Sequence, residues 1–426
     1  MESLVKVLNK HNLLFLFIVS FFFATGFLNY FGSVDKIAVQ WLYISIVLFI
    51  FICFFFLFKK NFWQPFRPKF YNFIVAAFLS FTFISLFFSN NINESIIVLS
   101  RFIVWVSLLY FFNFIFLKFK PSFYYVCLFL SLVLFFELTY SLNTLFQIIS
   151  ITDFVPQYSN LLKGVTGNKN ITAAIIAIKI PFVTYLLYSS RFFYQKLLIS
   201  LLLFISFFLL FFISSRTSFL SLSLSVILFI AFFVYDKSGN KYSNLFFFIL
   251  PVLLSYTVSN TYLSNNSSYT FSSRLASVAN VSESSVGVRL RFFGQAVSQI
   301  LEKPITGIGL GNWKLKSISL DKNNIVAYTV PYNVHNDILE LSAEIGIIGG
   351  FFFLLIFFSP LIFNFTKIVK TKFSDFKSVV LFCAIMIYFI DLNFNFPTYR
   401  PIMQVLIIFI ICLTFNHNYL NRMEHE

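Results

Sequence analysis

Runs of about twenty apolar residues follow one another along most of the chain, and they allow only one class of fold. A helix of that length crosses the hydrocarbon core of a bilayer and satisfies its own backbone hydrogen bonds there. A membrane-spanning β-barrel would instead show alternating segments of about ten residues. A soluble domain could not bury so much apolar surface, because 59% of the 426 residues are hydrophobic and only 11% are charged. The sequence therefore predicts an all-α, polytopic membrane protein.

Twelve segments qualify as membrane-spanning helices. They cover approximately residues 12–32, 37–58, 70–88, 96–117, 122–148, 171–188, 196–213, 217–235, 244–260, 337–364, 376–395 and 399–416. The first span has no small-residue cleavage site, so we expect a retained helix rather than a signal peptide. The spans divide the chain into three regions: 1–260 with spans one to nine, 261–336 as one large loop, and 337–426 with spans ten to twelve and the C-terminus.

The net charge of +15 is better explained by membrane topology than by nucleic-acid binding. With a cytoplasmic N-terminus, the inner segments hold 17 of the 31 basic residues: Lys6, Lys10, Lys59, Lys60, Arg67, Lys69, Lys118, Lys120, Arg191, Lys196, Lys237, Lys241, Lys367, Lys370, Lys372, Lys377 and Arg422. The short outer loops hold five: Lys36, Lys163, Lys169, Arg216 and Arg400. This positive-inside bias predicts that both termini are cytoplasmic and that the loop 261–336 is extracytoplasmic. We expect a lipid bilayer and no nucleic acid as partner.

The large loop has two parts. Residues 261–286 are rich in Ser and Asn, which indicates a flexible, exposed segment. From Gly287 onward, Leu290, Phe293, Val297 and Ile300 recur at helical spacing among polar residues. This pattern predicts an amphipathic helix that lies against the membrane surface or the helix bundle.

Three alternate glycines, Gly307, Gly309 and Gly311, follow this helix. They suit a tight backbone path close to another element or to a ligand. No strand–helix context surrounds them, so a nucleotide-binding loop is excluded. The four cysteines lie inside apolar runs without a C-x-x-C spacing, so neither a disulfide framework nor a zinc site is indicated.

His335 is the one histidine away from the chain ends, and it lies where the loop meets the tenth span. An imidazole there can accept a proton near neutral pH, and an unperturbed one would lose this ability as the pH falls through about 6–7. The alternative is an interfacial histidine that only caps a helix. Asp337, Glu340 and Glu344 follow on one helix face. They could orient the ring, bind sugar hydroxyls or hold a hard cation, although we expect no metal and no other cofactor.

Arg216, Arg289 and Arg291 are the candidate anion-binding residues. Arginine donates bidentate hydrogen bonds that match a phosphate. Arginines and a histidine at the outer surface fit a lipid-linked diphosphate, which leaves without a separate acid catalyst. The alternatives are a snorkelling Arg216 and a solvated helix face for the other two.

Several stretches of the chain resemble the O-antigen ligase and polymerase superfamily of bacterial envelope enzymes. They are Gly167-Asn168-Lys169-Asn170, Ser215-Arg216, Arg289-Leu290-Arg291-Phe292-Phe293, the block from Glu302 to Trp313 and the block from His335 to Gly346. The resemblance covers roughly residues 160–400 and includes the large loop before the tenth span. One departure is Phe293, where the family often has Trp four residues after the second arginine; this alignment favours Arg289 over Arg291.

The resemblance implies an enzyme of the bacterial inner membrane that transfers a glycan from undecaprenyl diphosphate at the periplasmic face. It implies that Arg216 and Arg289 bind the diphosphate and that His335 is the catalytic residue. The supporting motif residues would be Gly307, Gly309, Asn312, Asn336, Asp337, Glu340 and Glu344. A single displacement would invert the anomeric configuration.

The acceptor stays open between related activities. Ligation of O-antigen to lipid A-core is the first expectation, and repeat-unit polymerisation and protein O-oligosaccharyl transfer are the alternatives. A transporter or flippase is the alternative from another class, and in that case Glu137, Lys179 and Asp391 would mark an ion path rather than pairs across the bundle. No similarity between the two halves of the chain supports a transporter repeat.

Overall fold

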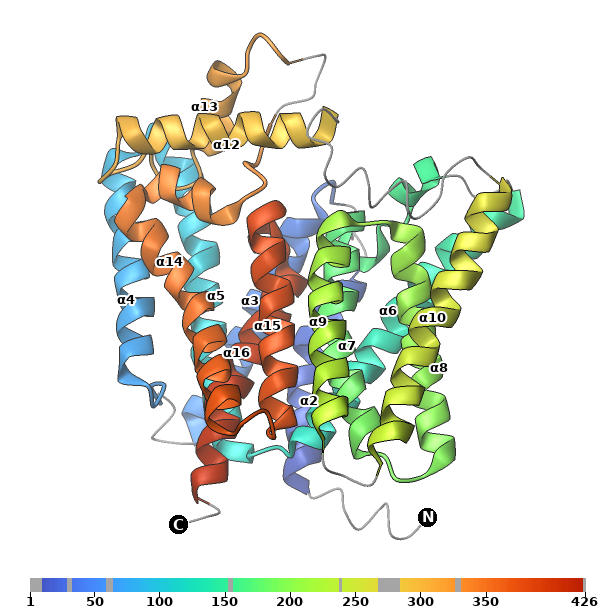
Figure 1. The fold of residues 1–426 in the computed structure, drawn as a ribbon. Helices are drawn as coiled ribbons and strands as arrows, with labels where there is room; N and C mark the ends of the chain where they lie inside the picture. Colours follow the sequence, from blue (N-terminus) through green and yellow to red (C-terminus); the bar gives the residue numbers. More distant parts are fainter. Residues whose placement is uncertain are drawn as a thin grey trace. The chain divides into compact units, whose positions relative to one another are not determined.

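The computed structural model describes residues 10–28, 33–58, 64–151, 156–236, 240–266, 284–325 and 331–423, and within these ranges it contains helices and no strands (Figure 1). Eleven of the described helices are long and apolar enough to cross a membrane, and Pro401–Asn416 forms a shorter apolar helix. The predicted all-α membrane architecture is therefore confirmed.

The helix bounds follow the predicted spans closely. The helices are α2 (Lys10–Phe23), α3 (Lys36–Phe58), α4 (Lys69–Ile84), α5 (Ile92–Phe119), α6 (Phe123–Ile151), α7 (Lys169–Ser189), α8 (Phe193–Ile213), α9 (Arg216–Tyr235), α10 (Lys241–Asn266), α12 (Ser284–Glu302), α13 (Trp313–Leu320), α14 (Asp337–Lys370), α15 (Phe376–Phe394) and α16 (Pro401–Met423). Short 3-10 turns occur at η1 (Ala24–Phe27), η2 (Ser85–Phe88), η3 (Pro156–Leu161), η4 (Gly164–Thr166) and η5 (Pro397–Tyr399).

The predicted flexible segment 261–286 needs correction at both ends. Helix α10 continues to Asn266, and the amphipathic helix α12 begins at Ser284 rather than at Gly287. The middle of this segment, 267–283, lies outside the described residues. The short helix α13 was not predicted, because its eight residues show no strong apolar periodicity.

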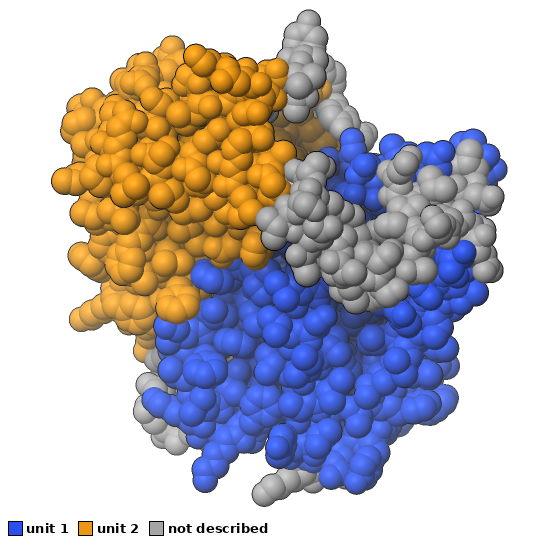
Figure 2. All heavy atoms as spheres, turned by 45° about the horizontal axis from the view of Figure 1, so that its top comes forward, with its two compact units in different colours: residues 1–27, 119–279, 361–391 blue, residues 28–118, 280–360, 392–426 orange. Residues whose placement is uncertain are grey.

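The chain forms two compact units, each built from three separate stretches (Figure 2). Unit 1 contains residues 1–27, 119–279 and 361–391, and unit 2 contains residues 28–118, 280–360 and 392–426. These contact-based units differ from the linear division of the sequence into spans and loop. Each unit is described here on its own.

In unit 1, α6 packs on α7, α7 packs on α8, and α8 packs on α10. Asn168 caps the N-terminus of α7, since its side-chain oxygen accepts the backbone N–H groups of Asn170 and Ile171 at 2.9 and 3.3 Å. Gly167 adopts the left-handed conformation just before this cap, with φ of 74°. The Gly-Asn-x-Asn element of the sequence is therefore a helix-start motif here.

Unit 1 also contains a buried ion pair between α6 and α7. The Lys179 ammonium lies 2.7 and 2.9 Å from the two Glu137 carboxylate oxygens, and both residues are almost fully buried. An ionisable group among apolar helices needs such a partner, because an unpaired charge is costly there. The predicted pairing of these two residues is confirmed, while Asp391 is buried on α15 within the same unit.

In unit 2, polar and aromatic contacts join α5 to α16. Trp105 Nε1 donates to the Gln404 side chain at 2.8 Å, and Asn416 Nδ2 donates to the Asn113 side chain at 2.9 Å. Between these two bonds, the Phe112 ring of α5 meets the Phe409 ring of α16 edge-on. These paired amide and indole groups satisfy buried donors that lipid could not satisfy.

Helix α14 is broken near its start. Gly346 has φ of 81° and ψ of 163°, so residues 337–345 form a separate short helix before the long span. The break frees carbonyl groups of the helix backbone. N–H groups of the segment 307–311, here called the glycine segment, bond to these carbonyls. Ile308 N–H donates to the Ala343 carbonyl at 3.0 Å, and Gly309 N–H donates to the Glu344 carbonyl at 2.9 Å. A membrane protein tolerates a helix break where such partners exist.

The glycine segment needs glycine because other backbone lies against it. A Cβ on Gly307 would lie 2.2 Å from the Glu344 carbonyl oxygen, and one on Gly346 would lie 2.1 Å from the Ile305 carbonyl oxygen. A Cβ on Gly309 would lie 2.5 Å from the Ser89 Cα atom. The prediction of a tight backbone path is confirmed, and the close neighbour is another element of the chain.

The amphipathic helix α12 covers this broken region and runs crosswise over the N-terminal end of α14 (Figure 1). Its buried residues Phe292 and Ala296 form one apolar cluster with Trp313, Val334 and Ala343. The cluster therefore joins α12, α13, the segment before α14 and the short helix 337–345. The predicted amphipathic helix is confirmed, but only part of its apolar face packs on protein, because Leu290 and Val297 of the predicted set are exposed.

The ion pair of unit 1 gives a stability prediction. Lys179→Met leaves the Glu137 carboxylate buried without its cation, so it should lower the free energy of unfolding by about 3–5 kcal/mol. Lys179→Met combined with Glu137→Leu should recover most of this loss, because two apolar groups replace the pair. Thermal denaturation of the purified protein in detergent measures both effects.

The matched control is the more exposed pair of Lys367 and Asp375 in the same unit, with an N–O distance of 2.7 Å. Lys367→Met should cost about 0–1 kcal/mol, as is usual for a solvated ion pair. An equal effect of Lys179→Met and Lys367→Met would refute a special contribution of the buried pair.

Candidate functional site

His335 lies in the segment 331–336 that leads into α14, and its backbone is unusual. Its φ is 65°, in the left-handed region that residues other than glycine seldom adopt. The next residue, Asn336, caps the helix by accepting the N–H groups of Ile338 and Leu339 at 3.1 and 3.0 Å. The helix cap is therefore Asn336, and the imidazole of His335 does not perform that role.

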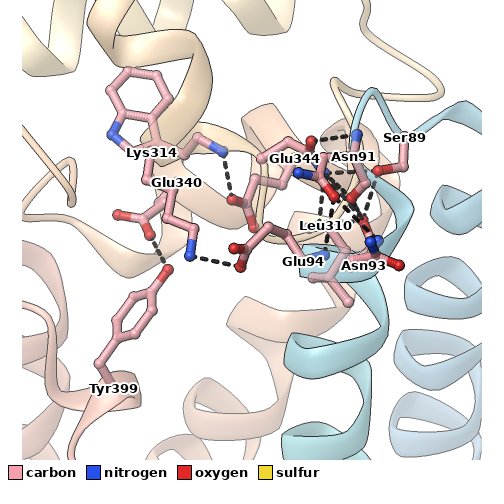
Figure 3. A network of polar contacts seen from close by, with 12 residues as sticks. Ser89, Asn91, Asn93, Glu94, Leu310, Lys314, Glu340, Glu344 and Tyr399 are labelled. Atoms are coloured by element: carbon pink, nitrogen blue, oxygen red, sulfur yellow. Dashed lines mark hydrogen bonds and ion pairs between the residues drawn. The ribbon is translucent and has the colours of Figure 1, made fainter. Parts of the chain in front are cut away.

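Glu340 holds the backbone that carries His335. One of its carboxylate oxygens accepts the Val334 N–H at 2.7 Å, and the other accepts the hydroxyl of Tyr399. Val334 and Glu340 are both buried. Glu340 therefore joins the residue before His335 to the turn that precedes α16 (Figure 3).

Asp337 makes a second connection to the same turn. Its Oδ2 atom accepts the Thr398 backbone N–H at 2.9 Å and also accepts the Thr398 hydroxyl. The Phe396 ring meets the His335 imidazole edge-on, with centroids 5.1 Å apart. The first turn of α14 and His335 are thus held by the stretch 396–399.

Glu344 and Asn312 fix the glycine segment. Glu344 accepts the Trp313 N–H at 2.9 Å, and Asn312 Nδ2 donates to the hydroxyls of Ser89 and Ser95 at 2.7 and 3.0 Å. The Asn312 side-chain oxygen also accepts the Asn91 N–H at 2.9 Å. Figure 3 shows this network between the start of α5 and the glycine segment. Asn312 therefore has a structural role in this unit.

The two arginines of α12 have different surroundings. Arg291 makes a bidentate ion pair with Asp321 at 2.8 and 3.1 Å, and Gln295 donates to the same carboxylate at 3.0 Å. Arg291 therefore joins α12 to the end of α13. Arg289 lies near enough to His335 for its charge to act on the imidazole. Of the two, Arg289 is the one whose charge acts on the histidine.

The imidazole of His335 is held neutral over a wide pH range. Burial and, to a smaller extent, the positive charge of Arg289 lower the pKa of His335 to about 4. Its Nδ1 atom is buried and has no hydrogen-bond partner among the described residues. The residue as a whole is partly exposed.

Arg216 belongs to unit 1, where it is the first residue of α9. The preceding helix ends at Ser214, which adopts the left-handed conformation with φ of 53°. The hydroxyls of Ser215 and Ser218 lie 3.3 Å apart beside it. A joint action of Arg216 with the residues of unit 2 stays a prediction.

A small cavity of about 30 Å³ lies behind the three carboxylates in unit 2. Asp337, Glu340 and Glu344 line it together with Arg101 and Trp105. The volume suits a water molecule rather than a substrate. Among the described residues no group of three His, Cys, Asp or Glu side chains is arranged to hold a metal ion, and the expectation of metal independence stays a prediction.

Sequence reasoning missed three residues that contact the site: Phe396, Thr398 and Tyr399. They follow the eleventh span, about 60 residues after His335. Their only sequence signal is a cluster of aromatic, proline and hydroxyl residues at a turn between two spans. That signal is common in membrane proteins, so the contacts were found only in three dimensions.

Comparison with known proteins connects this geometry to a family. Residues 201–354 match a family model described as O-antigen ligase, and this range includes every site residue named from the sequence. A stretch of 109 residues is 33% identical to a "Putative polysaccharide ligase" of Rickettsia conorii, and it covers 24% of this chain and 25% of that protein. The chain thus matches about a quarter of the length of this curated relative. The predicted resemblance is confirmed, and the part of the chain that carries the candidate site is similar to the O-antigen ligase family.

Proposed function

We propose that this protein transfers a glycan from undecaprenyl diphosphate to an acceptor hydroxyl at the periplasmic face of the bacterial inner membrane. The observation that carries the proposal is a neutral, partly exposed His335 beside Arg289. The ligase family match and the membrane-spanning helices support a polysaccharide ligase role. The positive-inside bias supports an extracytoplasmic location of this segment and cytoplasmic termini.

In this proposal His335 acts as the general base. Because Nδ1 is buried, we assign the role of base to Nε2, which takes the proton of the acceptor hydroxyl. The acceptor oxygen bonds to the anomeric carbon while the bond from that carbon to the diphosphate oxygen breaks. The diphosphate leaves with the bonding electrons, and the anomeric configuration inverts.

The arginines stabilise the leaving group. Arg289 lies beside the base, and Arg216 is proposed as a second cation for the diphosphate. Their planar donors match phosphate oxygens, and a fixed positive charge stabilises the negative charge that builds up as the bond breaks. A diphosphate leaves readily, so no acid catalyst is required. We propose lipid A-core as the acceptor, with transfer to a growing glycan or to a protein as the other outcomes of the assay.

The decisive experiment removes the base. His335→Ala should bind the lipid-linked donor almost normally but transfer glycan about 10²–10⁴-fold more slowly. Proteoliposomes with a labelled undecaprenyl-diphosphate glycan measure both release of the lipid diphosphate and glycan on each acceptor. His11→Ala is the matched control, since His11 lies on α2 in unit 1. Normal transfer by His335→Ala would return the chain to the transporter class.

The arginines should separate into two groups. Arg289→Ala and Arg216→Ala each lose a charged hydrogen bond to phosphate, worth about 1.5–3 kcal/mol, so turnover should fall about 10- to 150-fold. Lysine at either position should restore only part of it.

Arg291→Ala should instead lower the thermal stability, and Asp321→Asn should reproduce that effect because the two residues form one ion pair. Stability is measured by thermal denaturation alongside the turnover assay. Loss of turnover in Arg291→Ala with normal turnover in Arg289→Ala would exchange the two assignments.

The lowered pKa of His335 changes the expected pH dependence. A group with a pKa of about 4 stays neutral until the pH approaches 4, so kcat/KM should stay level from pH 7 to about 5. This replaces the fall at pH 6–7 expected for an unperturbed imidazole. Arg289→Met removes one cause of the low pKa, so the fall in its residual activity should move to higher pH. A fall of kcat/KM as the pH drops through 6–7 in the unaltered protein would contradict a buried neutral base.

A further inference from the structure

The turn between α15 and α16 makes three separate contacts with the segment that carries His335. Tyr399 bonds to Glu340, Thr398 bonds to Asp337, and Phe396 lies against the imidazole itself. These contacts join residues about 60 positions apart in the sequence, and all of them lie within unit 2. The family match ends at residue 354, so it assigns nothing to this turn.

We propose that Thr398 and Tyr399 are positioning residues that hold His335 in the orientation required for proton transfer. The proposal rests on the proposed function of His335 as the base. Neither residue needs to touch the substrate. Each acts through a carboxylate on the first turns of α14, and the effect reaches the imidazole through the backbone.

The Glu340 side chain connects Tyr399 to the backbone next to His335. The Tyr399 hydroxyl donates to one oxygen of Glu340, and the other oxygen accepts the Val334 N–H. The next residue is His335, whose left-handed backbone is unfavourable for an L-residue. A strained conformation of this kind persists only where neighbouring contacts determine it.

The turn itself is firmly held, so it can serve as a support. Gln404 Nε2 donates to the Pro397 carbonyl at 2.8 Å, and the Gln404 side-chain oxygen accepts Trp105 Nε1 at 2.8 Å. Thr398 contributes both its backbone N–H and its hydroxyl to Asp337. Burial and the nearby Glu340 and Glu344 carboxylates hold the pKa of Tyr399 well above its usual value, so its hydroxyl remains a donor.

The test compares two tyrosine hydroxyls of the same unit. Tyr399→Phe removes the bond to Glu340, whereas Tyr110→Phe removes a bond of 3.0 Å to the Asn72 side chain, which in turn bonds to the Phe66 backbone. Because a displacement of about 1 Å can cost about 10²-fold in rate, Tyr399→Phe should lower kcat about 10- to 100-fold. The KM for the lipid-linked donor should change less than about twofold, since no phosphate contact is lost. Tyr110→Phe should keep normal values.

A second measurement does not depend on catalysis. Diethyl pyrocarbonate modifies neutral imidazole, and mass spectrometry of the peptides gives the rate at His335 alone. This rate should rise in Tyr399→Phe and stay unchanged in Tyr110→Phe. If the unaltered protein transfers no glycan, the proposed function fails, and the modification rates alone then decide the positioning role. Equal kcat and equal modification rates in the two tyrosine variants would overturn it.

Two further variants cover the case in which Tyr399→Phe does not fold. Glu340→Gln keeps an oxygen for the Val334 N–H and offers an amide N–H to the Tyr399 hydroxyl oxygen, so its kcat should stay within about tenfold of normal while Glu340→Ala loses more. Thr398→Val loses the hydroxyl bond but keeps the backbone bond to Asp337, so a smaller fall in kcat is expected. A folded Thr398→Val with unchanged kcat and unchanged His335 modification would also overturn the proposal.

Discussion

The break in α14 at Gly346 is the feature on which the geometry of unit 2 depends. An unbroken helix would keep its carbonyl groups within its own ladder. The break instead offers the Ala343 and Glu344 carbonyls to the glycine segment, which packs at distances that a Cβ would prevent. The short helix 337–345 then carries three carboxylates directly below the apolar cluster of α12 and beside the segment of His335.

Those carboxylates serve as hydrogen-bond acceptors for the backbone around His335. Glu340 and Glu344 accept backbone N–H groups of Val334 and Trp313, and Asp337 accepts from Thr398. Their oxygens hold backbone in place, and the charge that acts on the imidazole is the cation of Arg289. A base that must stay neutral benefits from a nearby cation that also suits a phosphate group.

The sequence predicted the spans well because a run of apolar residues is a local property that the membrane alone selects. It also predicted the amphipathic helix and the close path of the glycines. It could not separate Arg289 from Arg291 by pattern, since the difference lies in Asp321, which is 30 positions away from Arg291 and bonds to it. The support from Tyr399 was hidden for the same reason, because hydrogen bonds between distant segments leave no periodic signal.

The alternative in which the carboxylates hold a hard cation meets a physical obstacle in this arrangement. A cation bound there would share the oxygens that accept the Val334, Trp313 and Thr398 N–H groups and would weaken those hydrogen bonds. It would also weaken the hold of Glu340 on the backbone next to His335. The same carboxylates cannot readily serve both roles, and this competition is why we assign the chemistry to the imidazole and the support to the acids.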